Sequence, residues 1–391
     1  MKSSRSRPSF VAHHLDDVPR SGIRDFFEIV SARHDVISLG VGEPDFTAPW
    51  HICEASMFAL ERGATSYTSN MGLIELREAL AEYTRGAYGA EYDPESEILV
   101  TVGVSEALDL AVRAVTEPGD DILYHEPSFV SYAPVIIFAH GNARAVATRR
   151  EEGFRLKRKD LEAALTDKSK AVILNYPTNP TGAVLPREDV EEIAAFATEH
   201  NLLVISDEIY SELTFEDEHF SIAALPGMKE RTILLSGFSK AWAMTGFRIG
   251  YACAIPELTE AMMKIHQYTM MCAPVLAQKA AVEALREGAE DVAYMRSEYE
   301  KRRNFICAAF DEMGVPCDRP DGAFYAFPYI GEFGLTSRDF SLRLLDEENV
   351  ACVPGTAFGP SGEGYLRCSF ATRIDDIKVA MERMARFVKS L

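Results

Sequence analysis

The 391-residue chain lacks the features that mark secreted, zinc-binding and membrane-spanning proteins. Its seven cysteines are scattered, odd in number and contain no C-x-x-C pair, which argues against a disulfide framework or a zinc site. No stretch approaches the roughly 18 consecutive apolar residues of a membrane span. The basic N-terminus leads into no signal-peptide core. We therefore expect a cytoplasmic protein that has no membrane partner and holds no metal.

Positive charge is also scarce. The sequence has 40 lysines and arginines against 60 aspartates and glutamates, and its net charge is −20. Nucleic-acid phosphates require clustered cations, so we expect no nucleic-acid partner. The composition is otherwise that of an ordinary globular protein, with 47% hydrophobic and 26% charged residues, and the chain is long enough to bury a large core.

The middle of the chain predicts an α/β fold. Between about residues 95 and 255, nearly continuous short apolar runs alternate with amphipathic stretches. Such runs are typical of strands that are covered on both faces. Strands that alternate with helices favour a mainly parallel sheet. The expected strands are 98–102, 121–124, 171–175, 202–206, 232–235 and 249–254, and the expected helices between them are 105–116, 129–139 and 187–200.

The remainder predicts a second, smaller domain. Residues 257–287 indicate two helices interrupted near Pro274, and residues 291–313 indicate one long helix. In the last hundred residues, short strands mix with helices, as in an α+β domain. We predict that residues 1–48 form an N-terminal arm and part of the small domain, 49–290 the large domain, and 291–391 the C-terminal small domain.

Lys240 is the residue that indicates the chemistry. It lies in Ser-Gly-Phe-Ser-Lys-Ala-Trp-Ala-Met-Thr-Gly-Phe-Arg-Ile-Gly, between two apolar stretches, and Arg248 follows eight positions later. An amine can bond to an aldehyde, and a fixed cation can hold a phosphate. Together they predict a lysine that carries pyridoxal 5′-phosphate. The alternative is a solvated surface lysine, which the flanking apolar runs disfavour.

Asp207 ends an expected strand, and Tyr210 follows three residues later. Ligands of open α/β sheets bind beyond the carboxyl ends of the strands, and a carboxylate near the core there requires a cation. A protonated pyridine nitrogen would supply that cation. Tyr210 could donate its hydroxyl to an oxygen of the same ring. The alternative for Asp207 is a helix N-cap.

Three further segments carry candidate cofactor contacts. Asn179 lies in the rigid turn Asn-Tyr-Pro-Thr-Asn-Pro-Thr-Gly, which can aim its amide at a ring oxygen. Val104 and Ser105 lie where a strand passes into a helix, whose N-terminal N–H groups bind phosphate. Phe129 follows a strand and could stack on a flat ring. The alternatives are an ordinary Asn-Pro turn, a serine N-cap and a core phenylalanine.

Two segments carry candidate substrate contacts. Arg367 stands between apolar strand residues, and its planar guanidinium suits the carboxylate of an amino acid. A structural salt bridge is the competing interpretation. Gly42 lies in the turn Leu-Gly-Val-Gly-Glu-Pro-Asp-Phe, where a missing side chain would let substrate approach the backbone.

Together these motifs resemble the class I/II aminotransferases of the aspartate aminotransferase superfamily, which are fold-type I pyridoxal phosphate enzymes. The resemblance covers roughly residues 20 to 390. It implies a mainly parallel seven-stranded sheet in the large domain and a homodimer with shared active sites. Many members carry a hydroxyl three residues before the lysine, where this chain has Gly237, so which nearby serine contacts the phosphate stays open.

The resemblance also implies a role for each candidate residue. Lys240 would bind the cofactor covalently, with Asp207 on the ring nitrogen, Tyr210 and Asn179 on the ring oxygen, and Phe129 stacked on the ring. The phosphate would contact Val104, Ser105, Ser236, Ser239, Arg248 and, from the neighbouring subunit, Tyr67, while Gly42, Asn179 and Arg367 would bind substrate.

The implied activity is ping-pong transfer of an amino group between an L-amino acid and a 2-oxo acid. One branch of the family recognises aspartate through a distal arginine, and the corresponding position of this chain is His266 or Gln267. A broad range of aspartate, aromatic and other apolar amino acids is therefore expected, with residues 20–27 closing over the substrate. A carbon–sulfur β-lyase is the alternative. A non-catalytic regulatory domain is a remote one, because the forty-odd residues before Gly42 leave no room for a DNA-binding module.

Overall fold

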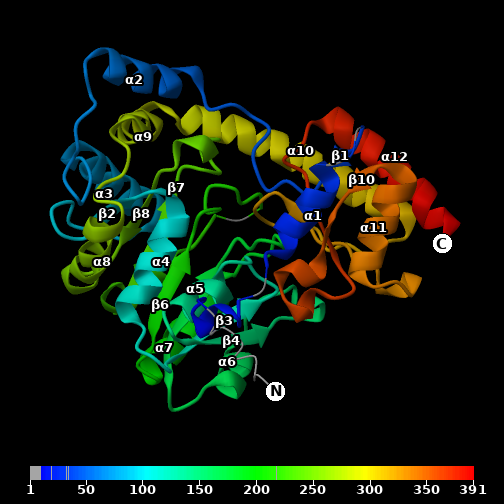
Figure 1. The fold of residues 1–391 in the computed structure, drawn as a ribbon, viewed down its shortest axis with the longest axis horizontal. Coiled ribbons are helices and arrows are strands. Elements are labelled where there is room, and N and C mark those ends of the chain that lie inside the picture. Colours follow the sequence, from blue (N-terminus) through cyan, green and yellow to red (C-terminus); the bar gives the residue numbers. More distant parts are fainter. Residues whose placement is uncertain (1–9, 19, 32, 34, 217) are drawn as a thin grey trace, which may run out of the picture.

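The computed structural model describes residues 10–18, 20–31, 33, 35–216 and 218–391, and its centre is a seven-stranded sheet (Figure 1). The strand order is β2-β8-β7-β6-β5-β3-β4. Only β8 runs antiparallel to its neighbours, so the predicted mainly parallel sheet is confirmed. The strands are β2 Ile98–Thr101, β3 Asp121–Glu126, β4 Asn142–Ala147, β5 Ser169–Asn175, β6 Leu203–Asp207, β7 Thr232–Gly237 and β8 Gly250–Cys253.

Strand β4 is the one that the sequence pattern did not predict. It pairs in parallel with β3 at the edge of the sheet, and most of its residues are partly or fully exposed. The other six strands consist mainly of buried residues, and their apolar runs were visible in the sequence. An edge strand that is exposed to solvent has no such apolar run, which explains why β4 was not predicted.

Helices cover both faces of the sheet. The helices of this part are α2 Trp50–Glu61, α3 Ile74–Tyr88, α4 Gly103–Val115, α5 Tyr132–Phe138, α6 Arg158–Ala164, α7 Arg187–Glu199, α8 Pro256–Thr269 and α9 Val275–Glu287. Successive strand residues point to opposite faces. Ile173 and Ile205 accordingly pack with side chains of α4 and α5, whereas Val172 and Val204 pack with side chains of α7.

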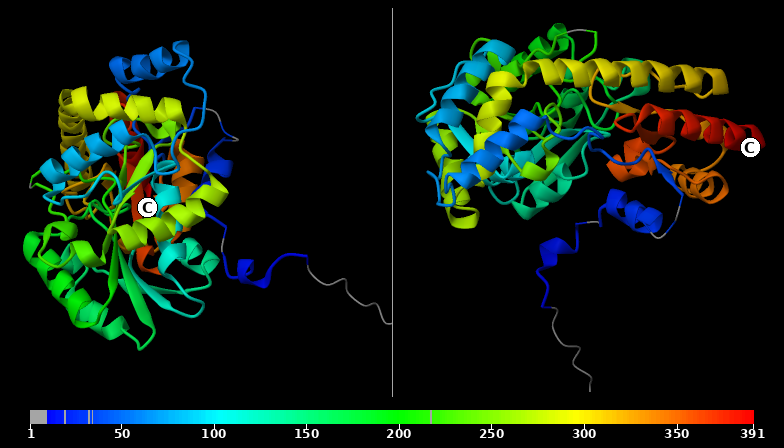
Figure 2. Two further views of the ribbon diagram at one scale, coloured as in Figure 1. Left: turned by 90° about the vertical axis from the view of Figure 1, so that its left-hand side faces the viewer. Right: turned by 90° about the horizontal axis from the view of Figure 1, so that it is seen from above.

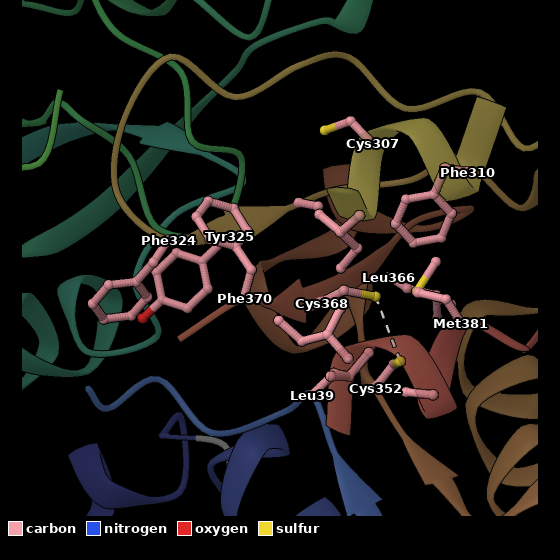
Figure 3. Packing of buried hydrophobic residues seen from close by; sticks show 14 of the residues in the cluster. Leu39, Cys307, Phe310, Phe324, Tyr325, Cys352, Leu366, Cys368, Phe370 and Met381 are labelled. Carbon is pink, nitrogen blue, oxygen red and sulfur yellow. Dashed lines mark hydrogen bonds between the residues drawn. The ribbon is translucent and has the colours of Figure 1, made fainter. Parts of the chain in front are cut away.

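A second, smaller sheet has the order β11-β12-β9. Its core contains Phe310, Phe324 and Phe370, and the Sγ atoms of Cys352 and Cys368 lie 3.4 Å apart there (Figure 3). Helix α10 runs from the large sheet to this region (Figure 2). The elements are β9 Tyr325–Ala326, β10 Val350–Ala351, β11 Val353–Pro354, β12 Leu366–Ser369, α10 Ala289–Met313, α11 Ser337–Glu348 and α12 Ile374–Ser390.

The N-terminal part joins the smaller region. Strand β1 Ile37–Ser38 pairs in parallel with β10, and helix α1 Gly22–Ser31 precedes it. Residues 1–9 lie outside the described part of the chain, and the domain boundaries at residues 48 and 290 stay predictions. Among the described helices, none combines the length and apolar character needed to cross a bilayer.

The strand ends that position the site lie at one edge of the large sheet. The carboxyl ends of β2, β3, β5, β6 and β7 meet there. Because β8 runs the opposite way, its beginning lies at the same edge. Arg248, just before β8, is thereby brought to the edge where Asp207 ends β6 and Lys240 follows β7. A ligand site is expected at this position in an open α/β sheet.

Candidate active site

A cavity of about 370 Å³ lies at this edge of the sheet. Most residues that the sequence singled out line it, although they come from distant segments of the chain. They are Gly42, Val104, Ser105, Phe129, Asn179, Asp207, Tyr210, Ser239, Lys240, Arg248 and Arg367. Two predicted residues, Ser236 and Tyr67, are not part of the lining.

Lys240 follows β7 and points its amine into this cavity. Its Nζ donates a hydrogen bond to the carbonyl oxygen of Gly42 at 2.6 Å. Burial lowers the pKa of Lys240 to about 8, and the positive charges of Arg367 and Arg248 add to the fall. A lysine with this pKa has an appreciable neutral fraction at pH 7, as a nucleophile or base requires.

Asp207 is a buried carboxylate at the end of β6. Its Oδ2 accepts from the Tyr132 hydroxyl at 2.8 Å, and its Oδ1 accepts from the backbone N–H of Ile209 at 3.3 Å. Burial raises the pKa of Asp207 to about 6, although both hydrogen bonds oppose the rise. No helix follows directly, so the N-cap interpretation is wrong. A cationic ring nitrogen would restore the ionised form.

Tyr132 was missed by the sequence analysis. It is the first residue of α5, three positions after Phe129, and its ring packs edge-on against Phe129 at 5.8 Å between centroids. The expected helix began at residue 129, whereas the observed one begins at Tyr132. Nothing in the local pattern linked Tyr132 to Asp207, because 75 residues separate them.

The start of α4 and Arg248 form a cradle for an anion. Gly103, Val104 and Ser105 begin this 13-residue helix, whose first N–H groups attract negative charge. The guanidinium of Arg248 lies directly against Gly103, since a Cβ at residue 103 would stand 2.7 Å from Arg248 Nη2. Gly103 also has φ +74°, so a side chain there is doubly disfavoured. The helix start and Arg248 thus offer two adjacent sources of positive charge for one phosphate.

The two serines near Lys240 have different positions. Ser239 lines the cavity. The prediction that Ser236 contacts the phosphate is wrong, because its buried hydroxyl accepts from Tyr88 at 3.2 Å and donates to the Glu208 carbonyl at 3.3 Å, away from the cavity. Gly237 cannot carry a hydroxyl either, since a Cβ there would lie 2.9 Å from Gly250 Cα.

Arg367 is 2% exposed and carries its charge without a carboxylate partner among the described residues. Its Nη1 donates to Asn179 Oδ1 at 3.0 Å and its Nη2 to the Gly40 carbonyl at 2.6 Å, while Nε has no partner. The rings of Tyr325 and Phe358 lie 4.5 and 4.8 Å from the guanidinium. The structural salt bridge is therefore excluded for the described chain. A buried cation in this state calls for an anionic ligand.

Asn179 and Tyr210 line the cavity together with Arg367 and Asp207. Asn179 uses its amide oxygen on Arg367, so its NH₂ group is the end left to donate to a ring oxygen. The hydroxyl of Tyr210 lies 2.9 Å from that of Tyr325, another lining residue that the sequence analysis missed. Both residues line the same cavity as Lys240 and Asp207.

The residues expected to contact the substrate side chain do not all lie at the cavity. His266 is buried on α8 and its Nδ1 lies 2.6 Å from Glu106 Oε1, so it does not replace the distal arginine. Ile23 brings α1 to the cavity. The side chains of residues 25–27 lie outside the described part, so the expected closure of residues 20–27 stays a prediction. Tyr67 is 81% exposed.

The chemistry of these groups fits the expected cofactor, pyridoxal phosphate. A buried carboxylate without a cation can face a pyridine nitrogen, a helix start with an arginine can hold a phosphate, and a lysine of lowered pKa can bond to an aldehyde.

Comparisons with known proteins agree with this chemistry. The family model Aminotransferase class I and II matches residues 34–384. YugH of Bacillus subtilis (strain 168), whose name gives a reaction class and no substrate, is 50% identical over 97% of this chain and 98% of its own. The aspartate aminotransferase of Pyrococcus abyssi is 46% identical over the same shares. The solved structure of an aromatic aminotransferase from Pyrococcus horikoshii OT3 has a TM-score of 0.90 and 46% identity, covering 94% of this chain and 99% of that one.

Proposed function

The chain belongs to the class I and II aminotransferases, and from this premise we propose how its residues carry out the reaction. It is a pyridoxal phosphate-dependent enzyme that transfers an amino group between an amino acid and a 2-oxo acid. One observation carries the residue assignment: Lys240, Asp207 and Arg367 all line a single cavity.

Each residue of this set would do one task. When bound, the cofactor supplies an electron-withdrawing ring that stabilises charge on the substrate α-carbon. Asp207 would hold the ring nitrogen in its protonated form. Lys240 would carry the cofactor and then move the α-proton with its Nζ, for which a pKa of about 8 is well suited. The start of α4, Ser239 and Arg248 would hold the phosphate, and Asn179 and Tyr210 the ring oxygen.

The same cavity supports a broad range of amino donors with an apolar preference. Arg367 would bind the α-carboxylate, next to Gly42, as any amino acid requires. The only other lysine or arginine side chains among the described lining residues are Lys240 and Arg248, which already have tasks. No described cation is left for a side-chain carboxylate, while Ile23, Phe129 and Ile209 offer apolar surface. Aromatic and other apolar amino acids are the favoured donors, and aspartate a weaker one.

A donor and oxo-acid panel with the purified protein tests this function. We expect amino transfer from aromatic and apolar amino acids that depends strictly on an added 2-oxo acid and shows ping-pong kinetics. Turnover of aspartate alone would contradict the apolar pocket. Release of pyruvate and ammonia from cystathionine without an oxo acid would instead identify a carbon–sulfur β-lyase.

We further propose a homodimer in which Tyr67 completes the phosphate site of the neighbouring subunit. The support is the exposure of Tyr67 together with other large apolar side chains of the large-sheet region. Among these are Trp50, Met57, Phe58, Leu60, Tyr268, Met270 and Met271. Four of them, Trp50, Met57, Phe58 and Leu60, lie on the single helix α2, and such a concentration of exposed apolar side chains is typical of a surface that another protein covers.

Subunit mixing tests the shared site. Chains carrying Lys240→Ala and chains carrying Tyr67→Phe are each expected to be impaired. Re-pairing should give half heterodimers, each with one intact site of two, so the mixture should reach about a quarter of wild-type activity. Lys240→Ala mixed with Arg367→Ala is the matched control, because both changes affect sites formed by their own chain and no intact site arises. A first mixture no better than this control would contradict the role of Tyr67.

The cytoplasm is the compartment that we propose. All seven cysteines are free, including the neighbouring pair Cys352 and Cys368, and disulfides are rare in that compartment. Counting seven reactive thiols in freshly isolated, denatured protein would support this assignment, and a lower count would contradict it.

A further inference from the structure

A buried polar network lies directly behind Asp207. Its centre is Glu208, the next residue, which is 1% exposed. Glu208 Oε1 accepts from the hydroxyls of Ser206 and Ser221, each at 2.8 Å. Glu208 Oε2 lies 2.7 Å from His219 Nε2. The serines are neutral, so His219 is the described partner of this carboxylate that can carry positive charge.

The network and the active site occupy opposite faces of the same strands. Leu174, Ser206 and Glu208 line a second cavity of about 690 Å³, whereas the alternate residues Asn175 and Asp207 line the cavity of Lys240. The two cavities share no lining residue. His219 borders the second cavity, so solvent reaches it without passing the cofactor site. The charged side chains bordering that cavity with the pair are Arg155, Arg187, Glu218 and Asp321.

We propose that His219 is a positioning residue for Asp207: as the ion-pair partner of Glu208, it offsets the charge of Glu208 that acts on Asp207, the carboxylate that is to face the ring nitrogen of the cofactor. This inference rests on the proposed function of Asp207. The main chain of Glu208, which connects the two carboxylate side chains, is held by two hydrogen bonds. Glu208 N–H donates to the Leu235 carbonyl at 2.8 Å, and the Glu208 carbonyl accepts from Ser211 N–H at 3.0 Å. These bonds hold the main chain that joins the two residues, so their side chains start from fixed positions on opposite faces of the sheet.

Electrostatics explains why the neutralisation matters. Two buried carboxylates in consecutive residues oppose each other's ionisation. Burial raises the pKa of Asp207 to about 6, and the charge of Glu208 adds to the rise. Burial together with Glu208 raises the pKa of Tyr88, on α3, to about 12, and also raises those of Tyr92 and Cys253. None of these three groups can become a cation. Arg155 and Arg187 border the cavity of about 690 Å³, and Arg296 borders a third cavity that His219 also lines together with Glu212, Glu216 and Glu300, but among the described residues only His219 forms an ion pair with Glu208.

Titration of the cofactor-free protein with pyridoxal phosphate, followed by absorbance between pH 5 and 8, tests the proposal. The bond to Lys240 requires the neutral amine, whose pKa is about 8, so affinity should fall gradually as pH drops from 8. Binding also requires ionised Asp207, so a second fall in affinity should have its midpoint near pH 6 in the wild type. In His219→Leu, Glu208 keeps its charge without a partner and raises the pKa of Asp207 further. The midpoint should then move up by about one pH unit, which weakens binding about fivefold at pH 6.

A second substitution separates charge from packing. Glu208→Gln removes the offending charge, so the double variant Glu208→Gln/His219→Leu should return the midpoint to the wild-type value or below it. A purely structural role for His219 predicts additive losses and no such rescue. His200→Leu is the matched control, because His200 packs on Phe196 with ring centroids 4.6 Å apart and lies outside the network. It should leave the midpoint unchanged.

The outcomes distinguish this inference from the function on which it rests. A His219→Leu protein with an unmoved midpoint, or a double variant with no rescue, overturns the role of His219 while the cofactor assignment stands. A wild-type protein that binds no pyridoxal phosphate overturns the function itself. If His219→Leu does not fold, His219→Gln, which keeps a hydrogen-bond donor but cannot become a cation, should shift the midpoint in the same direction.

Discussion

Replacing Lys240 with alanine is expected to lower kcat by about 10⁴-fold and to remove the covalently held chromophore. The lysine would supply both the covalent link and the proton transfer, and general acid–base catalysis alone contributes about 10²–10⁴-fold. Reduction of the wild-type holoenzyme with borohydride should fix the cofactor to the protein. The same treatment of the variant should leave it extractable. Steady-state rates and the absorbance of the washed, reduced protein measure both effects.

Two controls make this result specific. Lys240→Arg keeps a cation beside the Gly42 carbonyl but cannot bond to an aldehyde in the same way, so it should be as inactive as the alanine variant. Lys229→Ala removes a lysine that pairs with Glu97 at 2.8 Å, and should leave kcat unchanged. A Lys240→Ala protein that retains a borohydride-fixed chromophore would refute the central assignment.

Replacing Arg367 with alanine is expected to raise KM for all amino donors together, while the cofactor stays bound. The guanidinium would meet the α-carboxylate, which every donor has, inside a buried site. Removing one partner of a buried charge pair costs about 2–5 kcal/mol, which corresponds to a loss of about 30- to 5000-fold in kcat/KM. Initial rates with one aromatic donor and with aspartate measure it. A loss confined to a single donor would assign Arg367 to a side chain instead.

Arg303 provides the matched control for this variant. It is equally buried, but its Nη2 pairs with Glu216 at 3.0 Å and Glu300 at 3.3 Å. Arg303→Ala should leave KM unchanged and lower the melting temperature, because it removes two ion pairs and the packing of the buried guanidinium on the Phe215 ring. Arg367→Ala removes a cation that has no carboxylate partner in the described chain, so it should cost less stability than Arg303→Ala. Thermal unfolding of both variants without substrate distinguishes the two cases.

The sequence predicted those elements whose position in the fold leaves a local signal in the order of apolar and polar residues. Strands buried on both faces carry continuous apolar runs, so six of the seven strands of the large sheet were found near their observed bounds. Strand β4 is mostly exposed to solvent, so it carries no continuous apolar run and was missed. Lys240 and Asp207 were found because each stands beside an apolar run with a charge that burial would make costly.

Other features depend on contacts that no local pattern contains. Ser236 and Ser239 look equivalent in sequence, but only the sheet geometry shows that Ser236 bonds to Tyr88 on the far side. Tyr132 reaches Asp207 from another strand–helix unit. Whether Arg367 has a carboxylate partner could be decided only by placing the acidic residues around it.

The glycines around the phosphate cradle have a consequence for redesign of the enzyme. Gly103 and Gly250 pack so closely that a Cβ at residue 250 would stand 2.7 Å from the Gly103 carbonyl carbon, and Gly237 is confined by the same backbone. Libraries that randomise this edge would consist mostly of misfolded clones. Directed evolution toward new amino donors should instead vary Ile23 and the side chain of Thr245, which line the cavity and are not part of this glycine cluster.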